Sequence, residues 1–167
     1  FEAALKDLQA QGAILVEVKT FDEGPIGRAE GVVLYTELKA DLAAYLGSTD
    51  PRKVSSRTLA DLIAFNKATP KEFEWFGQET FEKAELTKGL ADPDYLKALA
   101  DAKRMAGPEG IDRILKETGA VAMIAPTTGP AWTIDPLNGD NYGGSSTTLP
   151  AVAGYPHLTV PMGDVTG

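Results

Sequence analysis

The sequence lacks cysteine altogether and contains one histidine among its 167 residues. Without cysteine, the chain cannot form a disulfide framework, a thiolate metal site or a thiol nucleophile. A single histidine also excludes multi-histidine metal motifs such as HExxH, and no phosphate-binding or dinucleotide-binding glycine motif is present. We therefore expect neither a bound metal nor a cofactor. The absence of cysteine fits any compartment, so the localisation stays open.

Positive charge and long apolar runs are also scarce. Sixteen Lys and Arg residues stand against 24 Asp and Glu residues, which gives a formal net charge of -8. An acidic chain without a basic block is a poor candidate for binding nucleic acid or an anionic membrane. No apolar run approaches the roughly 20 residues of a membrane span. With 43% hydrophobic and 24% charged residues, the composition is that of a globular protein.

Charge is distributed unevenly along the chain. No Lys, Arg or Glu occurs from Ala120 to Gly167. We therefore predict a helix-rich part over 1–119 and a part with strands and a long loop over 120–167. The chain begins within a helical pattern at Phe1 and stops just after an apolar run. These ends are expected of a piece of a longer protein.

Apolar residues at helical spacing predict four helical regions, over 1–11, 29–46, 58–66 and 71–88, the last as one or two helices. Asp92 and Pro93 are typical of the start of a further helix, because Asp caps and Pro fits the first turn. Pro108 is expected to break or restart that helix.

Three apolar runs have the length of strands: 13–18 (AILVEV), 120–125 (AVAMIA) and 157–160 (HLTV). The first follows a helix and Gly12, which is the order of an α/β unit. The second lies between Gly119 and Pro126 and fits a strand that is buried on both faces. These runs predict an α/β fold.

A long loop, from Pro126 to about Thr148, follows the second run. Structureless loops of more than about 15 residues in a compact domain are usually functional or disordered. Open α/β sheets place ligand sites beyond the ends of their strands. The loop offers hydroxyl, aromatic and carboxylate groups at Thr127, Thr128, Trp132, Asp135, Asp140, Tyr142, Ser145 and Ser146. A binding site and a stiff surface loop are equally good interpretations.

Residues 143–146 (GGSS) raise the question of a serine nucleophile. A catalytic serine needs a base within hydrogen-bond reach, and the GxSxG elbow is absent. A glycine turn followed by Ser/Thr caps for a short helix is the favoured interpretation. His157, the one histidine, is more readily a structural hydrogen-bonding residue than a catalyst.

Three stretches together resemble the C-terminal part of amidase signature family enzymes, most closely the bacterial peptide amidase type. They read MIAPTTGPAW, DPLNGDNYGGSS and LPAVAGYPHLTVPMG, and AGYPHLTVPMG is the most specific of the matching motifs. The segments TLADLIAFN and EWFGQETFEKA resemble the same branch. The resemblance covers essentially the whole chain and is strongest from Leu59 to Gly163.

The resemblance implies an α/β/α sandwich with a mixed sheet, of which residues 1–167 would be a late segment, incomplete at both ends. It implies a hydrolase that cleaves a carboxamide to an acid and ammonia through a Ser–cis-Ser–Lys acyl-enzyme mechanism. The Gly/Ser-rich signature that carries this triad is not in the sequence. We therefore assign no catalytic residue, and we expect the isolated chain to be inactive. The alternative is a non-catalytic binding or assembly module on an amidase-like scaffold.

The resemblance also implies that the long loop borders the acyl pocket. The candidate substrate-binding residues are then Thr127, Thr128, Trp132, Asp135, Tyr142, Ser145 and Ser146, with Gln78 and Glu79 as weaker candidates. The expected partner is a small-molecule or peptide amide substrate in the parent enzyme. A piece that has lost neighbouring strands would expose sheet edges, so we also expect it to self-associate.

Overall fold

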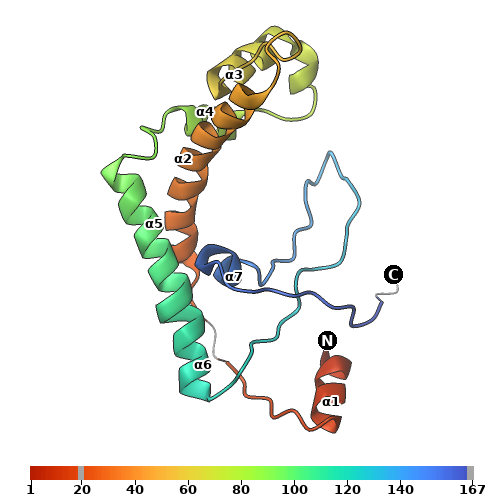
Figure 1. Ribbon diagram of the computed structural model, residues 1–167. Coiled ribbons are helices and arrows are strands. Elements are labelled where there is room, and N and C mark those ends of the chain that lie inside the picture. Colours follow the sequence, from red (N-terminus) through yellow and green to blue (C-terminus); the bar gives the residue numbers. More distant parts are fainter. Residues whose placement is uncertain (19–20, 165–167) are drawn as a thin grey trace. The chain divides into compact units, whose positions relative to one another are not determined.

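The computed structural model describes residues 1–18 and 21–164. The chain divides into two compact units, one of Phe1–Gly24 with Lys103–Gly167 and one of Pro25–Ala102. Helices make up 54% of the described residues and strand 1% (Figure 1). Among the described helices, none is both long enough and apolar enough to cross a membrane.

The unit of Pro25–Ala102 is built from helices. They are α2 (Gly24–Ser48), α3 (Leu59–Ala68), the 3-10 helix η1 (Pro70–Phe73), α4 (Glu79–Glu85) and the greater part of α5 (Pro93–Ala106). All the helical regions predicted here are confirmed, and the region 71–88 divides into η1 and α4. Helix α2 begins earlier than predicted, because Pro25 fits the first turn of a helix.

Polar contacts tie three helices of this unit together. The Lys39 ammonium on α2 donates to the Glu85 carbonyl oxygen at 2.6 Å and pairs with the Glu85 carboxylate at 3.1 Å. The Tyr95 hydroxyl on α5 donates to Glu37 Oε1 at 2.8 Å. The buried apolar side chains of the unit lie on these three helices and on α3: Ile26, Val33, Leu46, Leu59, Ala84, Tyr95 and Ala102. Helix packing therefore supplies the core here.

The other unit contains α1 (Glu2–Ala10), the π-helix η2 (Gly107–Asp112), α6 (Arg113–Thr118) and α7 (Thr148–Ala153). Near Pro108 the α-helix ends at Ala106 and resumes at Arg113, as predicted, but the segment between them is a π-helix and not a break in the chain. Pro108 lies in the first turn of η2, which leads from α5 into α6 without an interruption. The wider π turn accommodates a residue that has no backbone N–H and whose ring crowds the preceding turn.

Helix α7 packs on the π-helix η2. A Cβ atom on Gly110 would lie 2.8 Å from the Met105 carbonyl oxygen and 3.4 Å from Leu149 Cδ2. Just after α7, the Tyr155 hydroxyl donates to Asp112 Oδ2 at 2.8 Å, and this hydrogen bond raises the pKa of Tyr155. The start of α7, which directly follows the long loop, is thus fixed on η2.

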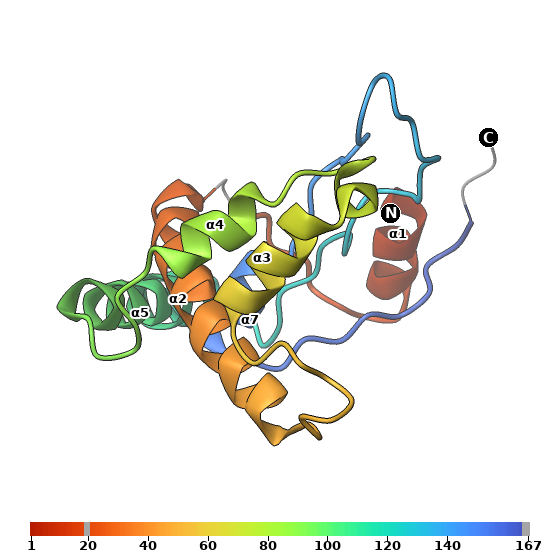
Figure 2. The ribbon, with the colours of Figure 1, turned by 90° about the horizontal axis from the view of Figure 1, so that it is seen from above.

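The predicted α/β fold with a mixed sheet is wrong for this chain. Within residues 1–18 and 21–164 the structure contains no sheet, and the runs 13–18, 120–125 and 157–160 are open chain (Figure 2). Ile14, Val121 and Leu158 are 91%, 98% and 89% exposed. The apolar pattern of these runs fits buried strands, but a strand exists only when a neighbour pairs with its backbone N–H and C=O groups. The described residues do not supply such neighbours.

We expect the purified chain to self-associate at micromolar concentration. The three runs present backbone groups that can pair with another copy, and their apolar side chains favour the same contact. Light scattering over a dilution series checks this expectation. A monomer at all concentrations that also unfolds cooperatively on heating would contradict it.

Candidate functional site

The loop of residues 126–147 is closed at its base (Figure 1). Thr128 and Ser145 form an isolated antiparallel bridge. Ser146 N–H donates to the Thr127 carbonyl oxygen at 3.1 Å, and the Thr128 hydroxyl donates to the Gly144 carbonyl oxygen at 3.1 Å. We call this set of paired residues, 127–128 and 144–146, the neck. The neck brings four of the predicted pocket residues together.

The two serines of the neck do not have the partners that a nucleophile needs. The Ser146 hydroxyl donates to the Pro126 carbonyl oxygen at 2.8 Å. Ser145 Oγ accepts from the Tyr142 hydroxyl at 2.9 Å and lies 3.0 Å from Thr147 Oγ1. A carbonyl, or a hydroxyl with no base behind it, cannot take up the proton of an attacking serine. These contacts hold the loop in shape and give no nucleophilic activation.

The glycine-turn interpretation of residues 143–146 is confirmed in its first half. Gly144 has a φ of 89°, which favours glycine at a tight turn. The predicted Ser/Thr capping is wrong, because the N-cap residue Thr147 makes no side-chain hydrogen bond to the first turn of α7. His157 is exposed. Within the described ranges, no three His, Asp or Glu side chains gather as a potential metal site.

Trp132 and Tyr142 form a second feature of the loop, which we call the aromatic corner. Their ring centroids are 6.2 Å apart, and the ring planes meet at 65°. The Trp132 indole N–H donates to Asp140 Oδ1 at 3.3 Å. Since the Tyr142 hydroxyl also donates to Ser145, the corner is connected to the neck by a hydrogen bond. Of the predicted pocket residues, Tyr142 is therefore joined to Ser145 of the neck, and Trp132 to Tyr142.

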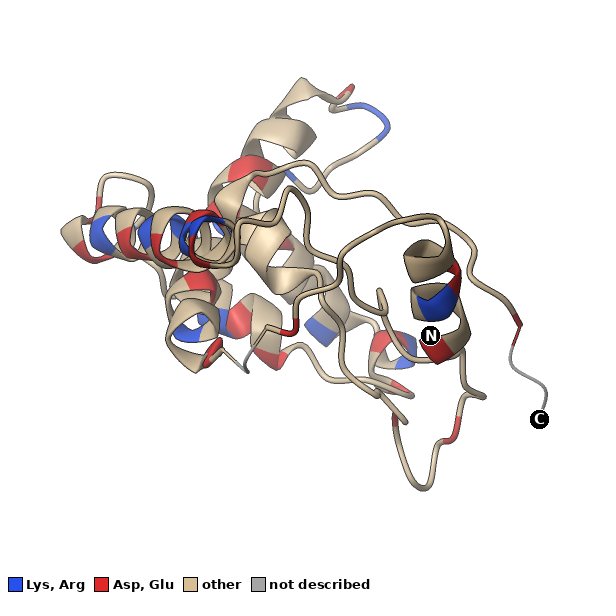
Figure 3. Cartoon of the chain, turned by 90° about the horizontal axis from the view of Figure 1, so that it is seen from below, with Lys and Arg blue, Asp and Glu red and all other residues tan. Residues whose placement is uncertain are grey.

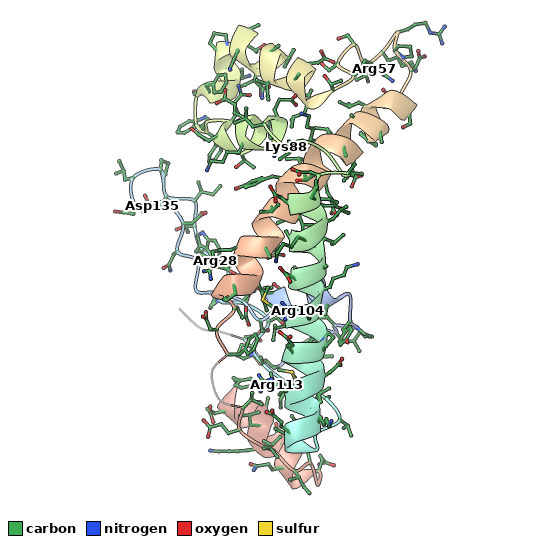
Figure 4. The ribbon with its side chains drawn as sticks, turned by 90° about the vertical axis from the view of Figure 1, so that its left-hand side faces the viewer. Arg28, Arg57, Lys88, Arg104, Arg113 and Asp135 are labelled. Atoms are coloured by element: carbon green, nitrogen blue, oxygen red, sulfur yellow. The ribbon has the colours of Figure 1, made fainter. Side chains whose placement is uncertain are left out.

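Asp135 stabilises a turn near the outer end of the loop (Figure 4). Its Oδ1 accepts from the backbone N–H groups of Leu137 and Asn138 at 2.9 and 3.0 Å, and its Oδ2 accepts from the Asn138 amide at 2.7 Å. The Asn138 side chain, followed by the two N–H groups, holds the pKa of the Asp135 carboxyl below its ordinary value. The carboxylate is thus engaged within its own turn.

The Asn138→Ala substitution should raise the pKa of Asp135 towards its ordinary value, because it removes the strongest donor. A carboxyl whose pKa is lowered by folding stabilises the turn above the unfolded pKa. That stabilisation is lost as the pH falls through the folded pKa. An NMR titration of the Asp135 carboxyl carbon measures the shift, with Asn141→Ala in the same loop as the control. An unchanged pKa in Asn138→Ala would contradict the assignment.

Gln78, the remaining predicted pocket residue, belongs to the unit of Pro25–Ala102. Its side chain is buried. The amide oxygen accepts from Asn66 Nδ2 at 3.1 Å, and the amide nitrogen lies 3.5 Å from both the Ile63 carbonyl oxygen and Glu82 Oε1. These contacts join α3 to α4 and show a structural role for Gln78. Glu79 is the first residue of α4.

Three contributors to the loop were not among the predicted pocket residues. Asp140 carries the indole contact, Thr147 contacts Ser145, and Thr159 Oγ1 lies 3.1 Å from Thr127 Oγ1. The loop and the chain after it carry only acidic charge (Figure 3). Composition indicated polar groups here, but the sequence contains no signal for which of them would pair.

Known proteins are similar to this chain over nearly its whole length. A probable amidase of Arabidopsis thaliana is 27% identical over 166 residues, covering 95% of this chain and 28% of the relative. The crystal structure of the peptide amidase PAM with the competitive inhibitor chymostatin is 46% identical, with a TM-score of 0.89, and the match covers 98% of this chain and 33% of that chain. No protein-family model matches the chain.

A second solved structure gives the same result. The native peptide amidase from Stenotrophomonas maltophilia is 45% identical, with a TM-score of 0.85, over 98% of this chain and 32% of that chain. The chain thus spans about a third of the length of the proteins it matches. These similarities confirm the resemblance that the motifs indicated.

Proposed function

We propose that this amidase-like chain supplies the scaffold and one substrate-facing wall of an enzyme that hydrolyses a carboxamide to a carboxylate and ammonia. The observation that carries the proposal is the match along 98% of this chain to a peptide amidase, of which it spans 33%. Residues 1–167 would then be a late segment of a single amidase domain. In that segment, 1–119 would be the helix-rich part and 120–167 the part with the substrate loop.

The chemistry would come from residues outside this chain. A serine hydroxyl oxygen attacks the carboxamide carbon, while its proton passes through a second serine to a lysine. The C–N bond then breaks, the nitrogen leaves as ammonia after taking up a proton, and water hydrolyses the acyl-serine ester. The proposal fits the serines of the neck, which donate to or accept from neutral groups.

The contribution of this chain would be to hold the substrate. The hydroxyl oxygens of Thr127, Thr128, Ser145 and Ser146 lie in the neck and can accept hydrogen bonds from amide N–H groups. Trp132 and Tyr142 provide apolar area beside them. A peptide amide fits this arrangement, because its amide groups can bond to the neck while its side chain contacts the aromatic corner.

A chimera tests the proposal. Residues 1–167 replace the corresponding third of the peptide amidase from Stenotrophomonas maltophilia, and ammonia release from a peptide amide is measured. We expect turnover by the chimera and none by the isolated chain. The matched control is the same chimera with the host's nucleophilic serine changed to alanine, which should be inactive.

Two results would overturn the proposal. A folded chimera without turnover would favour a binding or assembly module on the same scaffold. Turnover by the isolated chain, lost in Ser146→Ala, would place the nucleophile in the neck instead.

A further inference from the structure

Trp132, Tyr142 and Asp140 offer a corner with two aromatic walls and a carboxylate. We infer that this corner is a subsite for a cationic side chain of an amide substrate, such as the guanidinium of an arginine residue. The inference rests on the proposed function, because it assigns a substrate feature to the same loop.

The two rings pack edge to face and leave accessible surface on their outer sides. They meet at 65° with centroids 6.2 Å apart, so their planes form a corner and not a stack. Trp132 is 39% exposed and Tyr142 is 61% exposed, so both rings keep accessible surface. Aromatic faces carry partial negative charge and attract Lys and Arg groups that lie within about 6 Å of the ring centroid.

Asp140 adds a full negative charge at the edge of the corner. Its Oδ1 receives the Trp132 indole N–H at 3.3 Å. An ionised carboxylate has about four acceptor positions, so this one bond leaves capacity for a guanidinium. The indole bond also fixes the carboxylate next to the ring, which reduces the ordering needed when a ligand binds.

The surrounding charge has one sign. Between Ala120 and Gly167 the sequence contains Asp135, Asp140 and Asp164 but no Lys or Arg (Figure 3). No cation of the loop itself therefore competes for the corner. An acidic side chain would be repelled by the loop, and a neutral apolar side chain would gain only the contact with the rings.

The corner is also connected to the neck. The Tyr142 hydroxyl donates to Ser145 Oγ at 2.9 Å, and Ser145 is bridged to Thr128. A substrate whose amide groups bond to the neck would thus have its side chain beside Trp132 and Tyr142. This arrangement makes the corner a determinant of side-chain preference, separate from the bond-breaking groups.

Fluorescence of Trp132 tests the inference without any turnover. The chain has two tryptophans, and the exposed Trp75 is replaced in Trp75→Phe, so that Trp132 is the sole indole. The variant is titrated with the amides of Nα-acetyl-arginine, Nα-acetyl-leucine and Nα-acetyl-glutamate. We expect Kd for the arginine amide to be about 3- to 30-fold lower than for the leucine amide, and the glutamate amide to bind most weakly.

Asp140→Asn, added to Trp75→Phe, is the matched variant. It keeps an oxygen that can accept the indole N–H but removes the charge, so the arginine preference should fall severalfold while leucine amide binding stays the same. High salt on the Trp75→Phe chain should weaken the preference in the same direction, which keeps the test valid if Asp140→Asn alters the circular dichroism spectrum.

Equal affinities for the three amides, or a preference that neither salt nor Asp140→Asn changes, would overturn the inference. Such a result leaves the proposed function standing, because the chimera can still release ammonia from other amides. An inactive chimera, in contrast, would not remove a measured arginine preference.

Discussion

Leu59→Ala is expected to lower the free energy of unfolding by about 2–5 kcal/mol. Leu59 is the first residue of α3 and is 1% exposed. Removing its buried carbons loses their transfer free energy and leaves a cavity that the surrounding helices fill only in part. Urea unfolding followed by circular dichroism measures the loss.

Leu86→Ala provides the matched control for Leu59→Ala. Leu86 is 84% exposed and directly follows α4. The same change in composition should therefore alter the free energy of unfolding by less than about 0.5 kcal/mol. Equal losses for the two variants would show that Leu59 does not lie in a packed core.

Gly110→Ala should destabilise the unit that carries the long loop by about 1–3 kcal/mol. The new Cβ would lie 2.8 Å from the Met105 carbonyl oxygen, which belongs to the backbone and cannot move aside as a flexible side chain can. Either the π turn or α7 must shift. Thermal unfolding measures the effect, and loss of the Tyr155–Asp112 hydrogen bond should lower the pKa of Tyr155.

Gly31→Ala is the control, and its effect should have the opposite sign. Gly31 lies within α2, and a Cβ atom there would meet nothing within 4 Å. Alanine should then stabilise the helix by about 0.5–1 kcal/mol through its better propensity. A destabilised Gly31→Ala together with an unaffected Gly110→Ala would contradict the packing described for η2.

The helices could be predicted from sequence because their signals are local. The capping box of Thr58 and Asp61 marks the start of α3, and Gly119, with a φ of 68°, marks the end of α6. Each of these residues acts on groups within four positions along the chain. The π turn escaped prediction because the cost of Pro108 depends on the turn around it, which spacing alone does not fix.

The prediction of a sheet failed because the signals for a sheet are not local. The runs 13–18 and 120–125 have the composition of buried strands, but strand formation depends on partners that are distant in sequence. The candidate site shows both cases. The loop and its polar residues could be predicted from composition, whereas the Trp132–Tyr142 corner joins positions whose pairing no periodic pattern specifies.

Because the neck is closed, the positions of the two ends of the loop do not depend on the conformation of its outer part. Because Thr128 and Ser145 are bridged at the base, residues between them can change in number or kind without displacing α7. The sequence of the outer part of the loop can then vary while the bridged residues at its base keep their positions. Replacing the residues between Thr128 and Ser145 should therefore leave the packing of α7 on η2 unchanged.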